Sequence, residues 1–234
     1  MDLSVILPAY NEEEVIKSTI LKIVEFFKNQ ALTYEIIVVN DGSTDKTAKI
    51  VLELNYPNVR LINQENLGKG GAVRTGMLAS QGDYLLFLDA DYSTSINNLT
   101  KFLATIKNQQ ADVVIASRAL ADSIVDVHQN KIKEYLGKIG NQLIRLLLIK
   151  GINDTQCGFK LFNRKCLELF KKQKVFGWGF DFEILFLAQK FGYKIVQLPV
   201  IWQDKPDSKV KINGYLKTFK DLLLIKYFDL LNKY

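Results

Sequence analysis

Two aspartates one residue apart are the first side chains in this sequence whose types and spacing suggest chemistry. Asp89 and Asp91 directly follow an apolar run at 84–88 that is typical of a buried strand. Carboxylate oxygens are ligands that suit Mg²⁺ and Mn²⁺, and such a cation in turn binds the oxygens of a diphosphate. An Asp-x-Asp pair also occurs in turns that only begin a helix. The pair alone therefore leaves a metal site and a structural turn both open.

Three other polar clusters follow predicted strands, at 8–12, 40–43 and 117–118. Because the carboxyl ends of parallel strands meet at one edge of a sheet, we expect all of these clusters to gather there. Each cluster taken singly is also consistent with a turn or a helix cap. Together, with the aromatic Tyr10 and the acidic Asp41, they predict a pocket for a ring and its phosphates.

A glycine-rich stretch, Gly-Lys-Gly-Gly-Ala at 68–72, opens a predicted helix after the third strand. Backbone amides at the start of a helix can bind a phosphate group. The stretch lacks the Gly-Lys-Ser/Thr ending of a P-loop, and it follows the wrong strand for a dinucleotide fingerprint. A phosphate-binding loop and a closely packed turn both remain open.

The elements that must position these residues alternate regularly in the first half of the chain. Short runs rich in valine, isoleucine and leucine predict buried strands, and apolar residues at helical spacing between them predict helices. This alternation predicts an α/β fold with a mostly parallel, Rossmann-like sheet and helices on both faces. Asn11 and Glu14 have the spacing of a capping pair before the first helix. The predicted strands are 3–7, 35–39, 59–62, 84–88 and 113–116, and the predicted helices are 15–27, 48–54, 72–79 and 99–106.

The second half of the chain is less regular. It predicts helices at 131–149 and 182–191, a loop at 154–158 and a strand at 194–200. The segment 215–231 mixes leucine and aromatic residues with lysines, which is typical of an amphipathic helix with basic edges.

Composition places the chain among folded globular proteins, with 48% hydrophobic and 24% charged residues in 234. We expect one domain over 1–234, because no change in composition marks a boundary.

The net charge of +6 favours an anionic partner: phosphate, nucleic acid or an acidic membrane face. Neither a signal peptide nor an apolar stretch of the ~18 to 20 residues that a membrane span needs is visible, which predicts a soluble or peripheral protein. Two cysteines without a disulfide framework indicate a reducing cytoplasm, and the single His128 argues against a histidine-based metal site.

Three motifs resemble family 2 glycosyltransferases with the GT-A fold: Val-Ile-Leu-Pro-Ala-Tyr-Asn-Glu at 5–12, Val-Asn-Asp-Gly-Ser at 39–43 and Asp-Ala-Asp at 89–91. Further motifs are similar to dolichyl-phosphate β-glucosyltransferases, and the resemblance spans nearly the whole chain. Asp-Thr-Gln-Cys-Gly-Phe-Lys-Leu-Phe at 154–162 is the most specific of them. The others are Gly-Lys-Gly-Gly-Ala at 68–72, Ala-Ser-Arg at 116–118 and Trp-Gly-Phe-Asp-Phe-Glu at 178–183.

The resemblance implies donor-side roles for one group of residues. Asp89 and Asp91 match positions that hold the diphosphate and a divalent metal, Mg²⁺ or Mn²⁺. The residues expected to bind the nucleotide sugar are Pro8, Tyr10, Glu12, Asp41 and Lys69, together with Asp89.

On the acceptor side, the resemblance implies that Arg118 and Lys133 grip a phosphate. Related mannosyl enzymes have arginine at the position of Lys133. Asp154 and Asp181 match acidic positions near the sugar, and with Arg118 they are the catalytic candidates. The sequence does not rank the two aspartates.

The implied reaction is inverting transfer of a hexose, with glucose from UDP-glucose favoured, to a polyprenyl phosphate such as dolichyl or undecaprenyl phosphate. A phosphate monoester has a second pKa of about 6, so the nucleophile needs no strong general base.

Extracting the lipid into water would cost ~0.8 kcal/mol per methylene, so we expect a peripheral enzyme at the cytoplasmic face of the membrane. In this interpretation, two basic helical segments lie at the membrane surface, at 131–149 and 215–231. In the alternative interpretation, both segments are helices that pack on the sheet with their lysines in water. Relatives of this kind carry membrane spans at one end, and this sequence shows none, which leaves the means of attachment open.

Other functions also fit parts of the sequence. They include a GDP-mannose-dependent polyprenyl-phosphate mannosyltransferase and a family 2 transferase that acts on a polysaccharide or a soluble acceptor. A nucleotidyltransferase is disfavoured, because no glycine-rich basic loop follows the first strand. A non-catalytic, basic membrane-surface protein is the alternative from another class. We expect no nucleic-acid partner, and the oligomeric state is not predicted.

Overall fold

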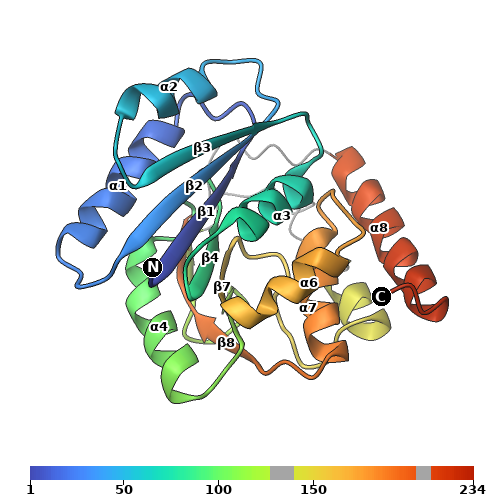
Figure 1. Cartoon of the computed structure of the whole chain (residues 1–234). Helices are drawn as coiled ribbons and strands as arrows, with labels where there is room; N and C mark the ends of the chain where they lie inside the picture. Colours follow the sequence, from blue (N-terminus) through green and yellow to red (C-terminus); the bar gives the residue numbers. More distant parts are fainter. Residues whose placement is uncertain (127–139, 204–211) are drawn as a thin grey trace.

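A computed structural model describes residues 1–126, 140–203 and 212–234. Its centre is a seven-stranded sheet with the strand order β3-β2-β1-β4-β7-β5-β8 (Figure 1). Neighbouring strands are parallel except at β7, which runs antiparallel to both β4 and β5. The predicted α/β sheet of mostly parallel strands is therefore confirmed. The strands are β1 Leu3–Ala9, β2 Tyr34–Asp41, β3 Val59–Gln64, β4 Tyr84–Leu88, β5 Val113–Ser117, β7 Phe159–Asn163 and β8 Ile195–Pro199, and a separate pair joins β6 Ile124–Asp126 to β9 Ile201–Gln203.

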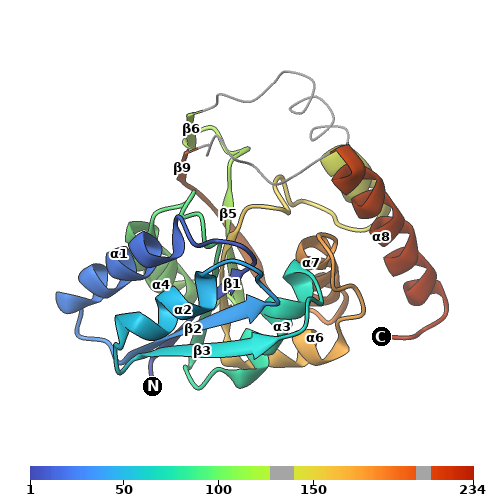
Figure 2. The same ribbon diagram turned by 90° about the horizontal axis from the view of Figure 1, so that it is seen from above.

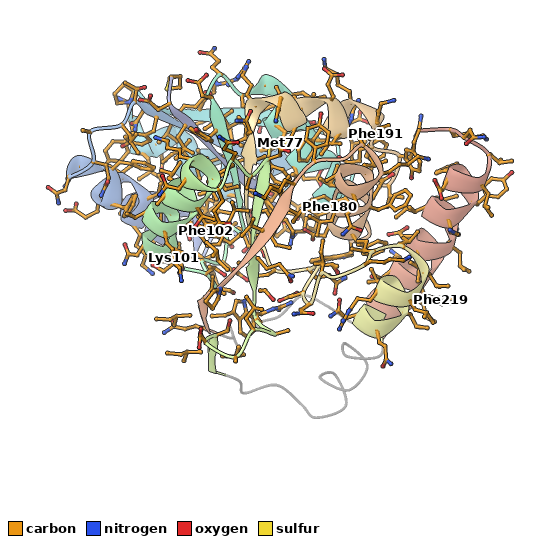
Figure 3. The ribbon with its side chains drawn as sticks, turned by 90° about the horizontal axis from the view of Figure 1, so that it is seen from below. Met77, Lys101, Phe102, Phe180, Phe191 and Phe219 are labelled. Carbon is orange, nitrogen blue, oxygen red and sulfur yellow. The ribbon has the colours of Figure 1, made fainter. Side chains whose placement is uncertain are left out.

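Helices cover both faces of the sheet, as predicted (Figure 2). Side chains alternate along each strand, so Val5 packs against one layer of helices and Ile6 against the other. Figure 3 labels Phe102 of α4 in the first layer and Met77 of α3 in the second. The first layer contains α1 Ile16–Lys28, α2 Thr47–Leu54 and α4 Leu99–Asn108, and the second contains α3 Lys69–Ala79, α6 Leu167–Lys172 and α7 Phe180–Lys190.

Four strands, β1, β2, β3 and β5, extend further at the carboxyl end than the apolar pattern predicts. Parallel pairing continues from Pro8 to Ala9 on β1 and through Asp41 on β2. The polar ends stay in the sheet because backbone hydrogen bonding does not depend on the side chain. Several residues predicted to follow a strand are therefore its last members.

The predicted capping pair at the first helix is wrong. Asn11 adopts a left-handed backbone conformation, with φ of +54°, and α1 begins only at Ile16. The side-chain oxygen of Asn11 accepts a hydrogen bond from the backbone N–H of Thr44 at 2.8 Å, and Ser43 Oγ accepts one from Asn11 N at 3.0 Å. Asn11 therefore ties together the loops that follow β1 and β2, which brings two predicted site clusters into contact.

The strand β7 was not predicted from the sequence, which indicates only the loop 154–158 before it. Because β7 is antiparallel to β4, it begins where β4 ends, with Phe159 opposite Leu88. The loop 154–158 therefore lies at the edge of the sheet that also carries Asp89 and Asp91.

The two predicted helices at 182–191 and 215–231 are confirmed as α7 and as α8, Ile212–Leu230. Of the predicted helix 131–149, the described part is helical over 140–147 and lies beside α8 (Figures 1 and 2). Within the described ranges, no helix combines the length and the apolar character that crossing a bilayer requires.

Candidate functional site

The carboxylates of Asp89 and Asp91 lie at the carboxyl end of β4, where the sheet rule predicts a ligand. Asp89 N donates to the carbonyl oxygen of Gly158 at 3.0 Å, and Ser93 N donates to Asp91 Oδ1 at 2.9 Å. A Cβ atom added to Gly158 would lie 1.8 Å from Asp89 Oδ2. The absence of a side chain at Gly158 therefore makes room for the Asp89 carboxylate.

A Gly158→Ala substitution should displace this carboxylate. A shift of about 1 Å at a reacting centre costs roughly 10²-fold in rate, so we expect a loss of kcat/KM of that order. Steady-state kinetics with varied donor would measure it. Gly140→Ala is the matched control, because a Cβ there has no neighbour within 4 Å. Full activity of the Gly158 variant would contradict the tight contact with Asp89.

Lys69, the first residue of α3, lies against this carboxylate, with Nζ 2.7 Å from Asp89 Oδ1. Burial disfavours its charge, but the carboxylates of Asp89, Asp181 and Asp91 outweigh that effect and raise the pKa of Lys69. Burial, together with the neighbouring Asp89, raises the pKa of Asp91. A cation bound here would offset the repulsion between the two carboxylates.

The donor set fits a divalent cation that shares its ligands with a substrate. Mg²⁺ is usually held by one or two carboxylates, substrate phosphates and water, and Mn²⁺ suits similar oxygen ligands. Among the described residues, no group of three or more histidine, cysteine, aspartate or glutamate side chains could hold a metal ion. Two carboxylates at a strand end could therefore share a divalent cation with the oxygens of a diphosphate.

The predicted nucleotide residues lie at the ends of the neighbouring strands β1 and β2. Tyr10 is exposed, whereas Pro8 and Glu12 are half-buried. Asp41 is buried and accepts hydrogen bonds from Gln64 Nε2 at 2.7 Å and from the N–H groups of residues 67 and 68 at 2.9 Å each. In this structure, Asp41 holds the loop that leads into α3.

These contacts bear on whether the backbone amides at 68–72 could bind a phosphate, one of the two roles that the sequence leaves open. The N–H of Gly68 is used by Asp41, and the N–H of Gly71 donates to the carbonyl oxygen of Phe176 at 3.1 Å. Two of the amides that were candidates for phosphate binding thus have partners within the protein. The side chain of Lys69 is the group of this loop that reaches the carboxylates.

Arg118 and Asp154 form a bidentate ion pair beside the end of β5. Arg118 Nε and Nη2 donate to the two oxygens of Asp154 at 2.7 and 2.9 Å, and Arg118 N donates to Asp154 Oδ2 at 3.0 Å. Burial opposes both charges, but each partner outweighs it, which lowers the pKa of Asp154 and raises that of Arg118. The Arg118 side chain is 31% exposed and lies over the ring of Trp202, 5.3 Å from its centroid.

A carboxylate at the end of β4 also interacts electrostatically with the Arg118–Asp154 pair. After Asp154 itself, the Asp89 carboxylate is among the groups that raise the pKa of Arg118. A hollow of about 570 Å³ lies next to the Arg118–Asp154 pair. Its lining includes Ala119 and Asn153, the chain neighbours of this pair, and Arg145 and Leu146 from the helical segment 140–147.

Asp181 forms a buried ion pair with Lys160, and both side chains are 2% exposed. Lys160 Nζ also donates to the carbonyl oxygen of Cys157 at 2.7 Å. Burial raises the pKa of Asp181, and Lys160 and Lys69 oppose this shift. Lys160 was not predicted as part of the site, although a single lysine within the apolar run 159–162 is the signal of a buried partner.

The structure therefore gathers Lys69, Asp89 and Asp91 at one place and the Arg118–Asp154 pair beside them. Lys133, the other predicted acceptor residue, lies outside the described residues.

Comparisons with known proteins agree with this arrangement. The profile described as Glycosyl transferase family 2 matches residues 4–170. A dolichyl-phosphate β-glucosyltransferase of Trichomonas vaginalis is 40% identical, over 98% of this chain and 74% of that protein. A dolichyl-phosphate β-glucosyltransferase of Homo sapiens is 35% identical, over 96% of this chain and 74% of that protein.

Among solved structures, the chain is similar to glucosyl-3-phosphoglycerate synthase from Mycobacterium tuberculosis in complex with Mn²⁺, UDP and glucosyl-3-phosphoglycerate. The TM-score is 0.71 at 20% identity, and the match covers 97% of this chain and 80% of the other. This likeness confirms the GT-A type of the α/β fold.

Proposed function

This chain belongs to glycosyl transferase family 2, and we propose that it transfers glucose from UDP-glucose to a polyprenyl phosphate, such as dolichyl or undecaprenyl phosphate, with inversion at the anomeric carbon. The observation that carries the proposal is the similarity to dolichyl-phosphate β-glucosyltransferases along nearly the whole chain. The match covers 98% of this chain, so it spans both the Lys69–Asp89–Asp91 cluster and the Arg118–Asp154 pair.

On the donor side, Asp91 and Asp89 would hold Mg²⁺ or Mn²⁺, and the Mn²⁺ in the complex of the similar synthase supports a divalent metal. When bound, the metal supplies positive charge that stabilises the leaving diphosphate. Lys69 adds a second positive charge next to Asp89. The proposed nucleotide contacts are Pro8, Tyr10, Glu12 and Asp41, at the adjoining strand ends.

On the acceptor side, Arg118 would bind the phosphate of the lipid, with Lys133 as a second proposed contact. The phosphate oxygen attacks the anomeric carbon as the bond to the diphosphate breaks, and the phosphate carries enough charge at neutral pH to need no strong base. Positioning two anions near each other is then the main task of the protein. Asp154 holds the guanidinium of Arg118 in place, and we expect the buried Asp181 to influence the site electrostatically, since it pairs with Lys160 and interacts with Lys69. The hollow beside Arg118 has basic and apolar lining, which suits an amphiphilic acceptor.

We further propose that the enzyme works at the cytoplasmic face of a membrane and that α8 contacts the lipid. The inner face of α8 is buried through Leu222 and Ile225. Its outer face carries a stripe of apolar side chains that are 46% to 70% exposed, at a spacing of three or four residues, flanked by lysines. Figure 3 labels Phe219 of this stripe at the edge of the molecule. The stripe consists of Leu216, Phe219, Leu223, Tyr227 and Leu230.

A Leu223→Glu variant should bind vesicles more weakly, because burying one leucine side chain in an apolar environment contributes about 1.5–3 kcal/mol. We expect the partition coefficient on vesicles with an acidic lipid to fall by roughly tenfold or more. Sedimentation with the vesicles would measure it. Leu52→Glu on α2 is the control, since Leu52 is 64% exposed outside α8. Equal binding by the two variants would exclude α8 as the membrane contact.

The proposed reaction is tested by pairing donors with acceptors. Purified protein with Mg²⁺ is incubated with UDP-glucose or GDP-mannose, and with a polyprenyl phosphate or a soluble glucan. We expect a glucosylated lipid phosphate from the first donor and first acceptor, and loss of this product with a chelator. Transfer from GDP-mannose alone would indicate a mannosyltransferase, and transfer to glucan alone would refute the lipid acceptor. No transfer in any pairing would contradict the proposed function.

A further inference from the structure

The helix α8 makes a close contact with a turn that leads into α7. Asp221 of α8 accepts a hydrogen bond from the backbone N–H of Gly179 at 3.0 Å. A Cβ atom added to Gly179 would lie 2.4 Å from the Cβ of Asp221. The helix and the turn thus fit together only because residue 179 has no side chain. Figures 1 and 2 show α8 on the outer side of α7.

The residue before this glycine is Trp178, which is 37% exposed. The Nζ atom of Lys69 lies 4.9 Å from the centroid of the Trp178 ring, and the same atom is 2.7 Å from Asp89 Oδ1. An ammonium group over an indole face is attracted by the ring. Trp178 is therefore placed to hold Lys69 toward the carboxylate.

The segment that carries Trp178 is also attached to the beginning of α3. The carbonyl oxygen of Phe176 accepts a hydrogen bond from Gly71 N at 3.1 Å. Gln173 Nε2 donates to the carbonyl oxygen of Gly70 at 3.0 Å. These bonds join the segment 173–179 to the loop that carries Lys69, and Asp221 joins the same segment to α8.

We propose that Asp221 is a positioning residue that keeps Trp178 over Lys69, so that α8 is a working part of the donor site. This inference rests on the proposed function, in which Lys69 and Asp89 face the donor diphosphate. The contact runs from the Asp221 carboxylate through Gly179 and Trp178 to the ammonium of Lys69. Asp221 itself touches neither substrate.

The kinetic test compares three variants at α8. Asp221→Ala removes the acceptor of the Gly179 N–H, whereas Asp221→Asn keeps an acceptor oxygen at that place. Asp229→Ala is the matched control, because Asp229 on the same helix pairs with Lys190 of α7 at 2.6 Å and with Lys226 at 3.7 Å. Removal of a cation–π interaction at a partly exposed ring corresponds to roughly a three- to tenfold effect, so we expect Asp221→Ala to raise the donor KM by about that factor.

In the same assays, the acceptor KM should stay unchanged in Asp221→Ala, and Asp221→Asn should restore the donor KM toward the original value. Equal donor KM values in Asp221→Ala and Asp229→Ala would overturn the proposal, because a general weakening of α8 would then explain the effect. Thermal unfolding of each variant reports whether it folds. If Asp221→Ala does not fold, Gly179→Ala displaces the same turn from the opposite side and is expected to raise the donor KM likewise.

A second measurement needs no substrate. The chain has two tryptophans, so a Trp202→Phe background leaves Trp178 as the only one. In that background, Asp221→Ala and Lys69→Met should each change the emission maximum of Trp178 and its quenching by acrylamide, whereas Asp229→Ala should not. An unchanged emission in Asp221→Ala would overturn the inference. If the original enzyme transferred no sugar but the emission changed as expected, the proposed function would fail and the positioning contact would stand.

Discussion

Asp91→Ala is expected to abolish sugar transfer while the protein stays folded. The Asp91 carboxylate lies at the end of β4 beside Asp89, and burial and that neighbour raise its pKa, which indicates a place where negative charge is concentrated. Without it, the cation that balances the leaving diphosphate loses a ligand. Loss of several kcal/mol of stabilisation corresponds to a fall in kcat/KM of at least about 10³-fold. Single-turnover assays with radiolabelled UDP-glucose would measure the residual rate.

Asp83→Ala is the control for this substitution, because Asp83 is an exposed aspartate just before the opposite end of the same strand. It should leave both transfer and thermal unfolding close to the original values. Calorimetric titration with UDP provides a second readout, in which Asp91→Ala should remove the increase in affinity that Mg²⁺ produces. Full turnover by the Asp91 variant would refute the metal assignment.

Arg118→Ala is expected to impair the acceptor much more than the donor. The guanidinium is held by both oxygens of Asp154, so its removal takes away the proposed phosphate contact and also leaves the Asp154 carboxylate buried without its partner. Truncating one partner of a charge pair between protein and ligand costs about 2–5 kcal/mol, so loss of the proposed Arg118–phosphate contact should lower kcat/KM for the lipid phosphate by roughly 30- to 5,000-fold. The donor KM should change little. Initial rates with each substrate varied in turn would separate the two effects.

Arg60→Ala provides a matched control for this second prediction. Arg60 pairs with Glu35 at 3.1 Å near the starts of β3 and β2, at the end of the sheet away from the site. It should reduce stability without changing either KM. An effect of Arg118→Ala that is confined to the donor would overturn the acceptor role.

The early strands and helices could be predicted because their signals are local. Runs such as Ile36 to Val39 are buried on both faces of the sheet, and a strand of this kind needs apolar residues at every position. The position of Asp89 followed directly, since it comes after the last residue of β4. The motif resemblance added the family, which the profile over residues 4–170 confirms.

Other features could not be predicted because they depend on neighbours that are distant in sequence. The strand β7 inserts between β4 and β5 with the opposite direction, which places Gly158 against Asp89. Lys160 is buried because Asp181 of α7 neutralises it. The capping role predicted for Asn11 failed for the same reason, since the backbone N–H of Thr44 binds its side chain instead.

The order of residues along the chain was sufficient to establish an α/β sheet, a pair of carboxylates at a strand end and membership of a glycosyltransferase family. All of these depend on periodicity or on short motifs, which are readable within one segment. Folding brings Lys69 onto Asp89, Asp154 onto Arg118 and Asp221 onto Gly179. Such contacts join elements separated by tens of residues, and their energies depend on burial and distance, which exist only once the layers have packed together.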